Sequence, residues 1–345
     1  MGTEQTGGRA HFARKREGLK RQEINHQQIA DNCSLLSAVS CQLLTMPELP
    51  EVETVRRGLE PHVVGGFIDD IEVGDSKIFQ IEPHLLLEQI RGQKILGLTR
   101  RGKFLIFELE RHYFIFHFGM TGQLTFRDPN RSDSEGFKRH PVTGLQRTLQ
   151  HAPDRHTHLQ IHLRQGGTML FRDIRKFGKV FLIEKGEVAV FFERLGLEPW
   201  TPEYNLKAFL QKFGNRKLAI KSLLLDQSFV AGVGNIYADE ALFTAGIHPA
   251  RKVRSLRKIE KESLFEAIPK VLEKGIEYGG TTLRDFVDSD GNTGSHQEKL
   301  QVYGRKGESC HRCGTLIQRM VISQRSTCFC PDCQPRSGRS RARIR

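Results

Sequence analysis

The sequence predicts an α+β protein in which an N-terminal helix and an antiparallel β-sandwich are followed by a helical domain with a zinc-ribbon hairpin. Three patterns lead to this fold class. Apolar and polar residues alternate through much of 94–185, apolar residues recur every three or four positions through much of 206–278, and two C-x-x-C pairs follow. With 345 residues, the chain is long enough for two domains with separate cores.

The first predicted element is a short helix at residues 50–59. Val52, Val55 and Leu59 recur at helical spacing. Acidic residues in the first turn precede two arginines, as the helix dipole favours.

Pro47 stands just before this helix, in a Met46-Pro47-Glu48 stretch that is typical of a protein start although it lies inside the chain. A proline suits a first helical turn, because the N–H that it lacks would have no partner there. Its ring nitrogen has a second use only if Met46 and everything before it are absent. It is then a secondary amine with a pKa of roughly 8, which can attack an electrophilic carbon and form a Schiff base.

Four segments in the first half alternate apolar and polar residues, which predicts the antiparallel strands of a sandwich. The Gln165-Gly166-Gly167 turn supports a hairpin within the third segment. Residues 127–156 lose the alternation and are interpreted as a long surface loop without chemistry. Scattered histidines such as His151, His156 and His158 more often face solvent or phosphate than a metal. The four segments are 94–110, 112–126, 158–173 and 179–185.

After a predicted hinge at 191–200, the pattern becomes helical. Gly232 and Gly234 precede the third helical segment, where free backbone amides attract anions. The stretch lacks both the strand of a dinucleotide site and the Lys-Ser/Thr of a P-loop, so we expect no nucleotide cofactor and favour a DNA phosphate as the anion. The helical segments are 206–213, 216–225, 235–245 and 255–278.

The two C-x-x-C pairs are separated by sixteen residues, which matches a four-cysteine zinc ribbon. We expect one structural Zn²⁺, with Arg319 and Arg325 displayed on the hairpin between the pairs. Cys328 breaks the spacing and is interpreted as a spectator, while Cys33 and Cys41 lie far upstream. The predicted ligands are Cys310, Cys313, Cys330 and Cys333.

The formal net charge of +13 favours a polyanionic partner, for which nucleic acid is the first candidate. No apolar run approaches the roughly 18 residues that span a bilayer, so we expect a soluble protein that does not enter a membrane. The last ten residues, 336–345, are rich in arginine and are interpreted as an electrostatic arm.

Six motifs follow one another along residues 46–333: Met46-Pro47-Glu48-Leu49-Pro50-Glu51-Val52-Glu53-Thr54, Arg101-Gly102-Lys103-Phe104, His117-Phe118-Gly119-Met120-Thr121-Gly122, Gly232-Val233-Gly234-Asn235-Ile236-Tyr237, Gln301-Val302-Tyr303-Gly304-Arg305-Lys306-Gly307 and the zinc ribbon. In this order they resemble formamidopyrimidine-DNA glycosylase. Leu49, where the related endonuclease VIII enzymes typically have glycine, favours the oxidised-purine branch.

The resemblance implies a sandwich and a helix-two-turns-helix domain that clamp damaged duplex DNA and flip the lesion out of the stack. Pro47 would be the Schiff-base nucleophile at C1′ of the sugar, and Glu48 the proton donor. Lys103 would donate the proton for β-elimination and Arg325 the proton for δ-elimination. The enzyme would thus be both a glycosylase for 8-oxoguanine and formamidopyrimidines and an AP lyase.

The resemblance also implies residues that hold the DNA. Asn235 and Arg325 would grip the phosphates that flank the lesion. Met120, Arg175 and Phe177 would enter the vacated stack, although core packing is the alternative for Met120 and Phe177.

Three further expectations concern the surroundings of these residues. Ile174 stands where relatives commonly have proline, so the rigidity of the loop that carries Arg175 could differ. Residues 290–295 would form a mobile lid over the flipped base. Glu51 would support the active centre by hydrogen bonding.

The resemblance implies a monomeric, bacterial, cytoplasmic enzyme with a leader before it. A retained leader would make Pro47 an amide, so either translation starts at Met46, which we favour, or a protease acts, or the chain is a non-catalytic damaged-DNA-binding zinc protein. The predicted parts are the leader (1–46, non-native or disordered), the catalytic sandwich (47–190), the hinge (191–200), the helix-two-turns-helix domain (201–285), the lid and zinc finger (286–334) and the basic tail (335–345).

Overall fold

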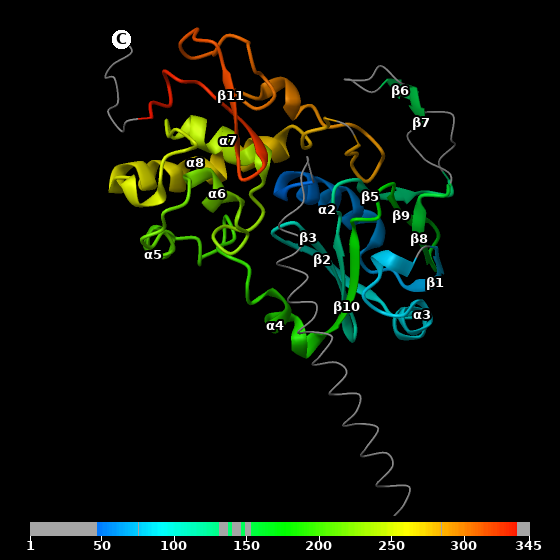
Figure 1. Cartoon of the computed structure of the whole chain (residues 1–345). Coiled ribbons are helices and arrows are strands. Elements are labelled where there is room, and N and C mark those ends of the chain that lie inside the picture. The colour runs from blue at the N-terminus through cyan, green and yellow to red at the C-terminus, as the bar shows by residue number, and fades with distance from the viewer. Residues whose placement is uncertain are drawn as a thin grey trace, which may run out of the picture.

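A computed structural model describes residues 47–336 apart from 75, 131–136, 140–145, 149–152 and 284. The leader with Cys33 and Cys41, His151 and the end of the basic tail lie outside the described residues. The chain forms a β-sandwich and a helical region, and the hairpin of β11 extends over the helical region on the side of α7 (Figure 1). In the described part of the chain, no helix is both long and apolar enough to span a bilayer.

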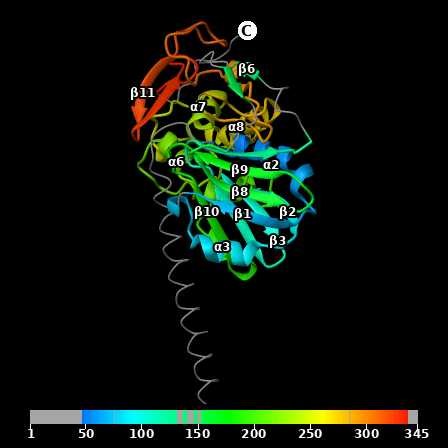
Figure 2. The ribbon, with the colours of Figure 1, turned by 90° about the vertical axis from the view of Figure 1, so that its right-hand side faces the viewer.

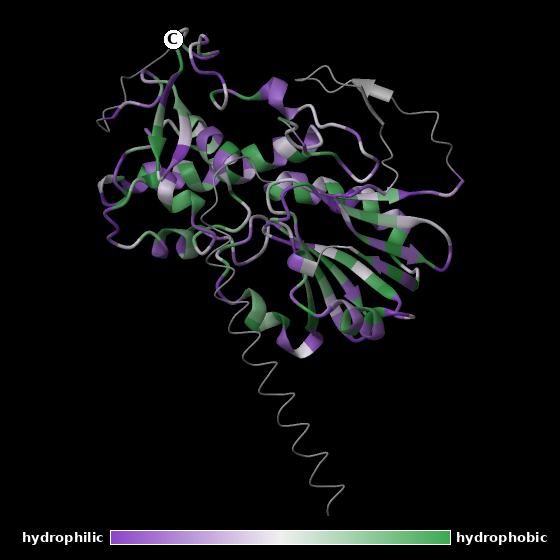
Figure 3. Ribbon diagram, turned by 45° about the vertical axis from the view of Figure 1, so that its right-hand side comes forward, coloured by the Kyte–Doolittle hydropathy of each residue, from purple (hydrophilic) through white to green (hydrophobic). Residues whose placement is uncertain are grey.

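Two four-stranded antiparallel sheets form the sandwich. One has the order β1-β8-β9-β5 and the other the order β10-β4-β3-β2. Hydrophobic residues concentrate along the strands, as Figure 3 shows in green, and the apolar core lies between the sheets. The strands are β1 (Ile68–Val73), β2 (Ile95–Arg101), β3 (Phe104–Leu109), β4 (His112–His117), β5 (Gly122–Arg127), β8 (Thr157–Leu163), β9 (Thr168–Asp173) and β10 (Lys179–Glu184).

All four predicted strand segments form strands, and three of them contain two strands each. Gly102, with a φ of +56°, makes the turn between β2 and β3. The predicted turn at 165–167 joins β8 to β9 through Gly166 and Gly167, both at positive φ, which glycine adopts without steric cost.

Within residues 47–185, three features were not predicted from the sequence. β1 shows no strict alternation, because its exposed positions do not fall on every second residue. The eight-residue helix α3 (Pro83–Ile90) was not predicted. Within the segment predicted as a loop, β6 (Phe137–Arg139) pairs with β7 (Gln146–Thr148) over three residues each, too few for a visible period.

Helix α2 (Leu49–Val63) lies between the two halves of the molecule. Val52, Val55 and Leu59 belong to the sandwich core, as their spacing predicted. Leu49 instead packs into the helical core, where its backbone N–H donates to Gly232 O at 3.0 Å. One short helix therefore joins both cores.

The second half is helical, with a two-stranded hairpin at its end (Figure 2). The predicted helix at 216–225 begins only at Ile220, because residues 216–219 pair with 251–254: Ile220 N donates to Arg251 O at 2.8 Å and Val253 N to Leu218 O at 3.0 Å. The elements are α4 (Val188–Phe192), α5 (Leu206–Gln211), α6 (Ile220–Leu225), α7 (Asn235–Thr244), α8 (Lys258–Glu277), β11 (Gln318–Ile322) and β12 (Arg325–Phe329).

The segment predicted as a hinge is fastened to both halves. Glu198 is 6% exposed and accepts from the Arg100 and Arg101 guanidinium groups and from the Gly102 amide at 2.8 Å. Next to it, Leu197 N donates to Phe229 O at 3.1 Å. Glu198 thus ties the end of β2 to the linker that enters the helical region.

Replacing Glu198 by glutamine removes the carboxylate partner of the half-buried Arg101 and one of the two partners of Arg100, which keeps Glu53, so we expect Glu198→Gln to lower the free energy of unfolding by about 2 kcal/mol. Denaturant unfolding followed by tryptophan fluorescence measures this. Glu193→Gln is the control, because Glu193 and Arg194 are both more than half exposed and such pairs contribute about 1 kcal/mol or less. Equal stabilities for the two variants would contradict the assignment.

Candidate active site

The carboxyl group of Glu48 lies against the N-terminus of α7. It accepts backbone N–H groups from Gly234 at 2.7 Å, Ile236 at 2.9 Å and Tyr237 at 3.4 Å. These donors have no partner within the helix, which is why a helix N-terminus binds an anion. Burial raises the pKa of Glu48 above the ordinary 4.5, while Lys103 and the three amides oppose the rise.

Glu51, one turn further along α2, holds the same region from the other side. Its carboxyl group accepts from Thr281 N at 2.7 Å, from the Tyr237 hydroxyl at 2.8 Å and from Glu48 N at 2.8 Å. Burial, and secondly the nearby Glu48, raise the pKa of Glu51 to about 7. The expected supporting role of Glu51 in hydrogen bonding agrees with these contacts.

His296 completes this buried cluster and was not found from the sequence. Its ring stacks on Tyr237 with centroids 5.5 Å apart, and its Nδ1 lies 3.0 Å from the Thr281 hydroxyl. The residue is 3% exposed, and burial lowers the pKa of the imidazole to about 4. No local sequence pattern predicted this contact, because Tyr237, Thr281 and His296 come from three separate segments.

Lys103 is buried at the turn between β2 and β3, 7% exposed. Burial lowers the pKa of its ammonium group, Glu48 raises it, and the Arg325 guanidinium lowers it further. Burial and Lys103 together lower the pKa of His117 to about 3, so this imidazole is neutral. The structure therefore gathers Glu48, Lys103 and Arg325 from three distant segments into one electrostatic group.

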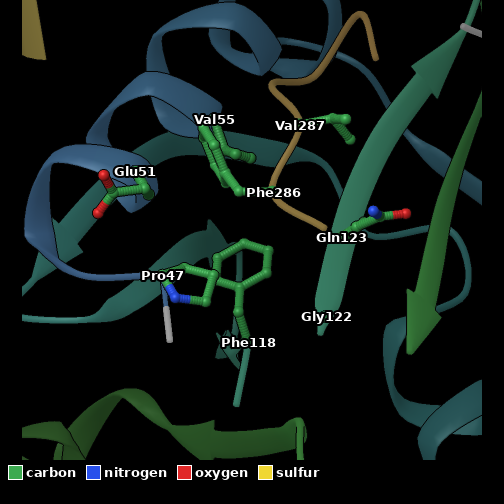
Figure 4. Close-up of a pocket in the computed structure, with 8 residues that line it drawn as sticks. All are labelled: Pro47, Glu51, Val55, Phe118, Gly122, Gln123, Phe286 and Val287. Carbon is green, nitrogen blue, oxygen red and sulfur yellow. The ribbon is translucent and has the colours of Figure 1, made fainter. Parts of the chain in front are cut away.

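Pro47 lines a narrow pocket between the sandwich, α2 and the segment after α8 (Figure 4). Figure 4 shows its ring beside Phe118. The segment that closes the pocket is bonded to the sandwich, since Phe126 N donates to Ser289 O at 2.8 Å. The lining residues are Pro47, Glu51, Val55, Phe118, Gly122, Gln123, Phe286 and Val287.

The segment predicted as a lid, 290–295, is ordered by hydrogen bonds in this structure. Asp288 accepts from Asn292 N at 2.7 Å, and Gly294 N donates to the Thr282 hydroxyl at 2.9 Å. The segment begins three residues after Val287, which lines the pocket. Its mobility stays a prediction.

Met120, Arg175 and Phe177 lie in two adjoining turns at one end of the sandwich. The Arg175 guanidinium lies over the Phe177 ring at 4.8 Å, whereas Met120 is buried and only 6% exposed. A Cβ on Gly119 would come within 2.5 Å of the Phe177 backbone, so the turns approach as closely as glycine permits. His158 was expected to face solvent or phosphate, but it is only 2% exposed and hydrogen-bonds Asp173 O at 2.9 Å, so that expectation is wrong for this histidine.

Asn235 is the first residue of α7. Its side-chain Oδ1 is buried and accepts no hydrogen bond from a described residue. Because this oxygen only accepts hydrogen bonds, a phosphate at the helix N-terminus would bind the Nδ2 group of Asn235 instead. Asn235 thus adjoins the amides that hold Glu48.

The zinc hairpin is anchored on α7. The Lys221 ammonium, fully buried, contacts Asp239 Oδ1 at 2.7 Å and donates to Ser326 O at 2.9 Å, while Cys328 N donates to Asp239 Oδ2 at 2.9 Å. This pair fixes β12, and with it Arg325, against the helix that receives Glu48. Lys221 and Asp239 were not singled out from the sequence, because their partners are distant in the chain.

The four predicted cysteines converge, with all Sγ atoms within 4.8 Å of one another. The Sγ pairs 310/333, 313/330 and 313/333 are 3.9, 3.4 and 3.4 Å apart. Zinc–thiolate bonds of about 2.3 Å place tetrahedral sulfurs about 3.8 Å apart, so the group fits one structural Zn²⁺. Cys328 lies outside it, as expected.

Cys330 and Cys328 are both buried and two residues apart, which makes them a matched pair for testing the zinc site. We expect Cys330→Ala to lose zinc and Cys328→Ala to keep about one zinc per chain. Elemental analysis after dialysis measures both. A full zinc content in Cys330→Ala would contradict the ligand assignment.

The neutral His296 predicts acid sensitivity. The imidazole of His296 takes up a proton below about pH 6.5 in the unfolded chain, but only below about pH 4 in the folded chain. The stability that the neutral imidazole contributes above pH 6.5 is therefore lost as the pH falls from 6.5 to 4. We expect His296→Gln, which can still accept from Thr281, to reduce this loss by up to about 1.4 kcal/mol per pH unit. Denaturant unfolding between pH 7 and 4.5 measures it, and parallel curves for both proteins would refute the prediction.

Comparison with known proteins identifies three family domains in the chain. The formamidopyrimidine-DNA glycosylase N-terminal domain matches residues 46–180, the H2TH domain of the same family 195–287, and a zinc finger found in FPG and IleRS 307–336. Their order confirms the predicted fold class and the zinc cofactor.

Similar proteins and structures cover most of the chain. The formamidopyrimidine-DNA glycosylase of Herpetosiphon aurantiacus is 44% identical over 84% of this chain and 100% of its own length, and that of Desulfitobacterium hafniense 41% identical over the same shares. The Lactococcus lactis Fpg bound to abasic-site DNA has a TM-score of 0.73 at 36% identity, over 84% of this chain and 99% of that one. The same protein bound to Fapy-dG DNA has a TM-score of 0.72 at 36% identity, over 84% and 100%. The chain therefore belongs to the formamidopyrimidine-DNA glycosylase family of DNA repair enzymes.

Proposed function

We propose that this chain removes oxidised purines, 8-oxoguanine and formamidopyrimidines, from duplex DNA and then cleaves the strand through a Schiff base on Pro47. The observation that carries the proposal is the placement of Pro47 and Glu48. Pro47 lines a pocket, and the next residue is a buried carboxyl group with a raised pKa. The relatives are named for the formamidopyrimidine lesion, and the similar structures hold damaged DNA.

The first step joins Pro47 to the sugar. The lone pair of its ring nitrogen forms a bond to C1′ as the glycosidic bond breaks. The base leaves with the electron pair of the glycosidic bond and takes up a proton, and the nitrogen loses its own proton, which frees its lone pair for the next step. Glu48 protonates O4′ so that the sugar ring opens and the C1′–N bond becomes an iminium. The raised pKa of Glu48 supports this role, because burial makes this carboxyl group bind a proton more readily than an exposed glutamate does.

The second stage breaks the DNA strand. Loss of a proton from C2′ expels the 3′ phosphate, and a further elimination expels the 5′ phosphate. Lys103 and Arg325 are the proposed proton donors for the two eliminations. Their electrostatic coupling to each other, and that of Lys103 to Glu48, supports the assignment. Asn235 and Arg325 would hold the flanking phosphates of the DNA, which the net charge also favours.

Pro47 can act only as a free chain terminus, because an acylated proline nitrogen is not nucleophilic. The chain would work as a monomer on damaged duplex DNA, with zinc in a structural role and no nucleotide cofactor. The other candidate, a non-catalytic damage-binding protein, follows if the residues before Pro47 are retained.

Borohydride trapping tests the proposal. With an 8-oxoguanine:cytosine duplex, we expect a covalent adduct at Pro47 from a chain that begins there, and none from the full 345-residue chain. Peptide mapping by mass spectrometry locates the adduct. Absence of an adduct from the short form, when it is zinc-loaded and binds the duplex, would overturn the catalytic proposal and leave the damage-binding protein.

A further inference from the structure

A single buried carboxylate joins the two turns that carry Met120, Arg175 and Phe177. Asp173, the last residue of β9, is fully buried. Its Oδ1 accepts from the Thr121 hydroxyl and from Arg175 N at 3.1 Å, and its Oδ2 accepts from Gly178 N at 2.7 Å. Both oxygens are therefore used, one toward each end of the 174–177 loop.

Thr121 links this carboxylate to the other turn. Its hydroxyl donates to Asp173 and accepts from Arg175 N at 3.2 Å, so one side chain bonds to both residues. Thr121 directly follows Met120 in the chain. The hydrogen bonds thus run from the neighbour of Met120 to the backbone of Arg175 and to the residue after Phe177.

The loop between Asp173 and Gly178 has no proline to fix its backbone. Ile174 leaves the loop backbone free to rotate, and Lys176 adopts a φ of +57°, which is unfavourable for a residue with a side chain. A conformation of this kind persists only when its surroundings hold it. Asp173 and Thr121 provide that hold, together with the close approach of Gly119 to Phe177.

We propose that Asp173 and Thr121 are positioning residues for base extrusion, which keep Met120, Arg175 and Phe177 in one arrangement so that they enter the stack together. The inference rests on the proposed function, in which these three residues fill the space of the flipped base. It assigns the two polar residues a role in extrusion and none in bond breaking.

This role predicts different effects on the reactions of two DNA substrates. A lesion base stacked in a duplex must be unstacked before Pro47 reaches C1′, so its removal depends on the inserted residues. A preformed abasic site has no base to unstack, so its cleavage depends mainly on the amine and the proton donors. Loss of the Thr121 bonds should slow the first reaction selectively.

Thr121→Val tests this, because valine keeps the shape of threonine and removes the hydroxyl. Under single-turnover conditions we expect excision of 8-oxoguanine from a duplex to slow by about tenfold, since a hydrogen bond to a charged group is lost. Cleavage of the same duplex with an abasic site should stay within about twofold of wild type. Thr121→Ser, which restores the hydroxyl, should recover excision.

A double-mutant cycle adds a readout that general destabilisation does not produce. If Thr121 acts through Arg175, then Thr121→Val should slow excision much less in an Arg175→Ala background than in wild type. Thermal unfolding of each zinc-loaded variant shows that it is folded at the assay temperature.

Three results would overturn the inference: equal slowing on both substrates, a Thr121→Ser enzyme as slow as Thr121→Val, or fully additive effects with Arg175→Ala. Failure of the proposed function looks different, because the unmodified enzyme beginning at Pro47 would then cleave neither substrate and form no borohydride adduct.

Discussion

The hydrogen bonds between Glu48 and the N-terminus of α7 are the constraint on which the rest of the structure depends. They join the residue after Pro47 to a helix almost two hundred positions away in the chain. A buried helix end needs acceptors for its first amides, and a buried carboxyl group needs donors, so each satisfies the other. Because Glu48 also begins α2, these bonds set where the sandwich and the helical region meet.

Helix α7 organises the remaining parts through residues that follow one another along it. Tyr237 bonds to Glu51, Asp239 to Lys221 and the zinc hairpin, and Glu240 accepts three backbone amides from 301–303 at 2.9 Å. Helix α7 is buried along almost its whole length, and its buried Tyr237, Asp239 and Glu240 are tolerated because each has a partner. The zinc hairpin is thus connected to the residues around Glu48 through one central helix, α7.

The concentration of buried charge at this junction costs stability and provides reactivity. Burial raises the pKa of Glu48 and of Glu51 and lowers that of Lys103, so the acids hold protons more readily and the ammonium group less readily than in water. Shifts in these directions bring the proton affinities of the acids and of the ammonium group closer together, as general acid–base chemistry requires.

The sequence by itself determined the features that depend on local spacing. Strand alternation predicted most of the sandwich, the Val52, Val55 and Leu59 spacing predicted the core face of α2, and two C-x-x-C pairs predicted the zinc site. The ordered motifs also indicated the family and predicted Pro47, Glu48 and Lys103 as catalytic residues.

Only the tertiary structure decided how distant polar residues pair. The contacts of His296, the pair of Lys221 and Asp239, and the bond of Thr121 to Asp173 join residues 15 to 59 positions apart, and no short-range period predicts such contacts. The late start of α6 has the same cause, because pairing with 251–254 overrode a helical pattern at 216–219. Spacing reports which face of an element is buried, whereas the partner of a buried charge is set by the fold as a whole.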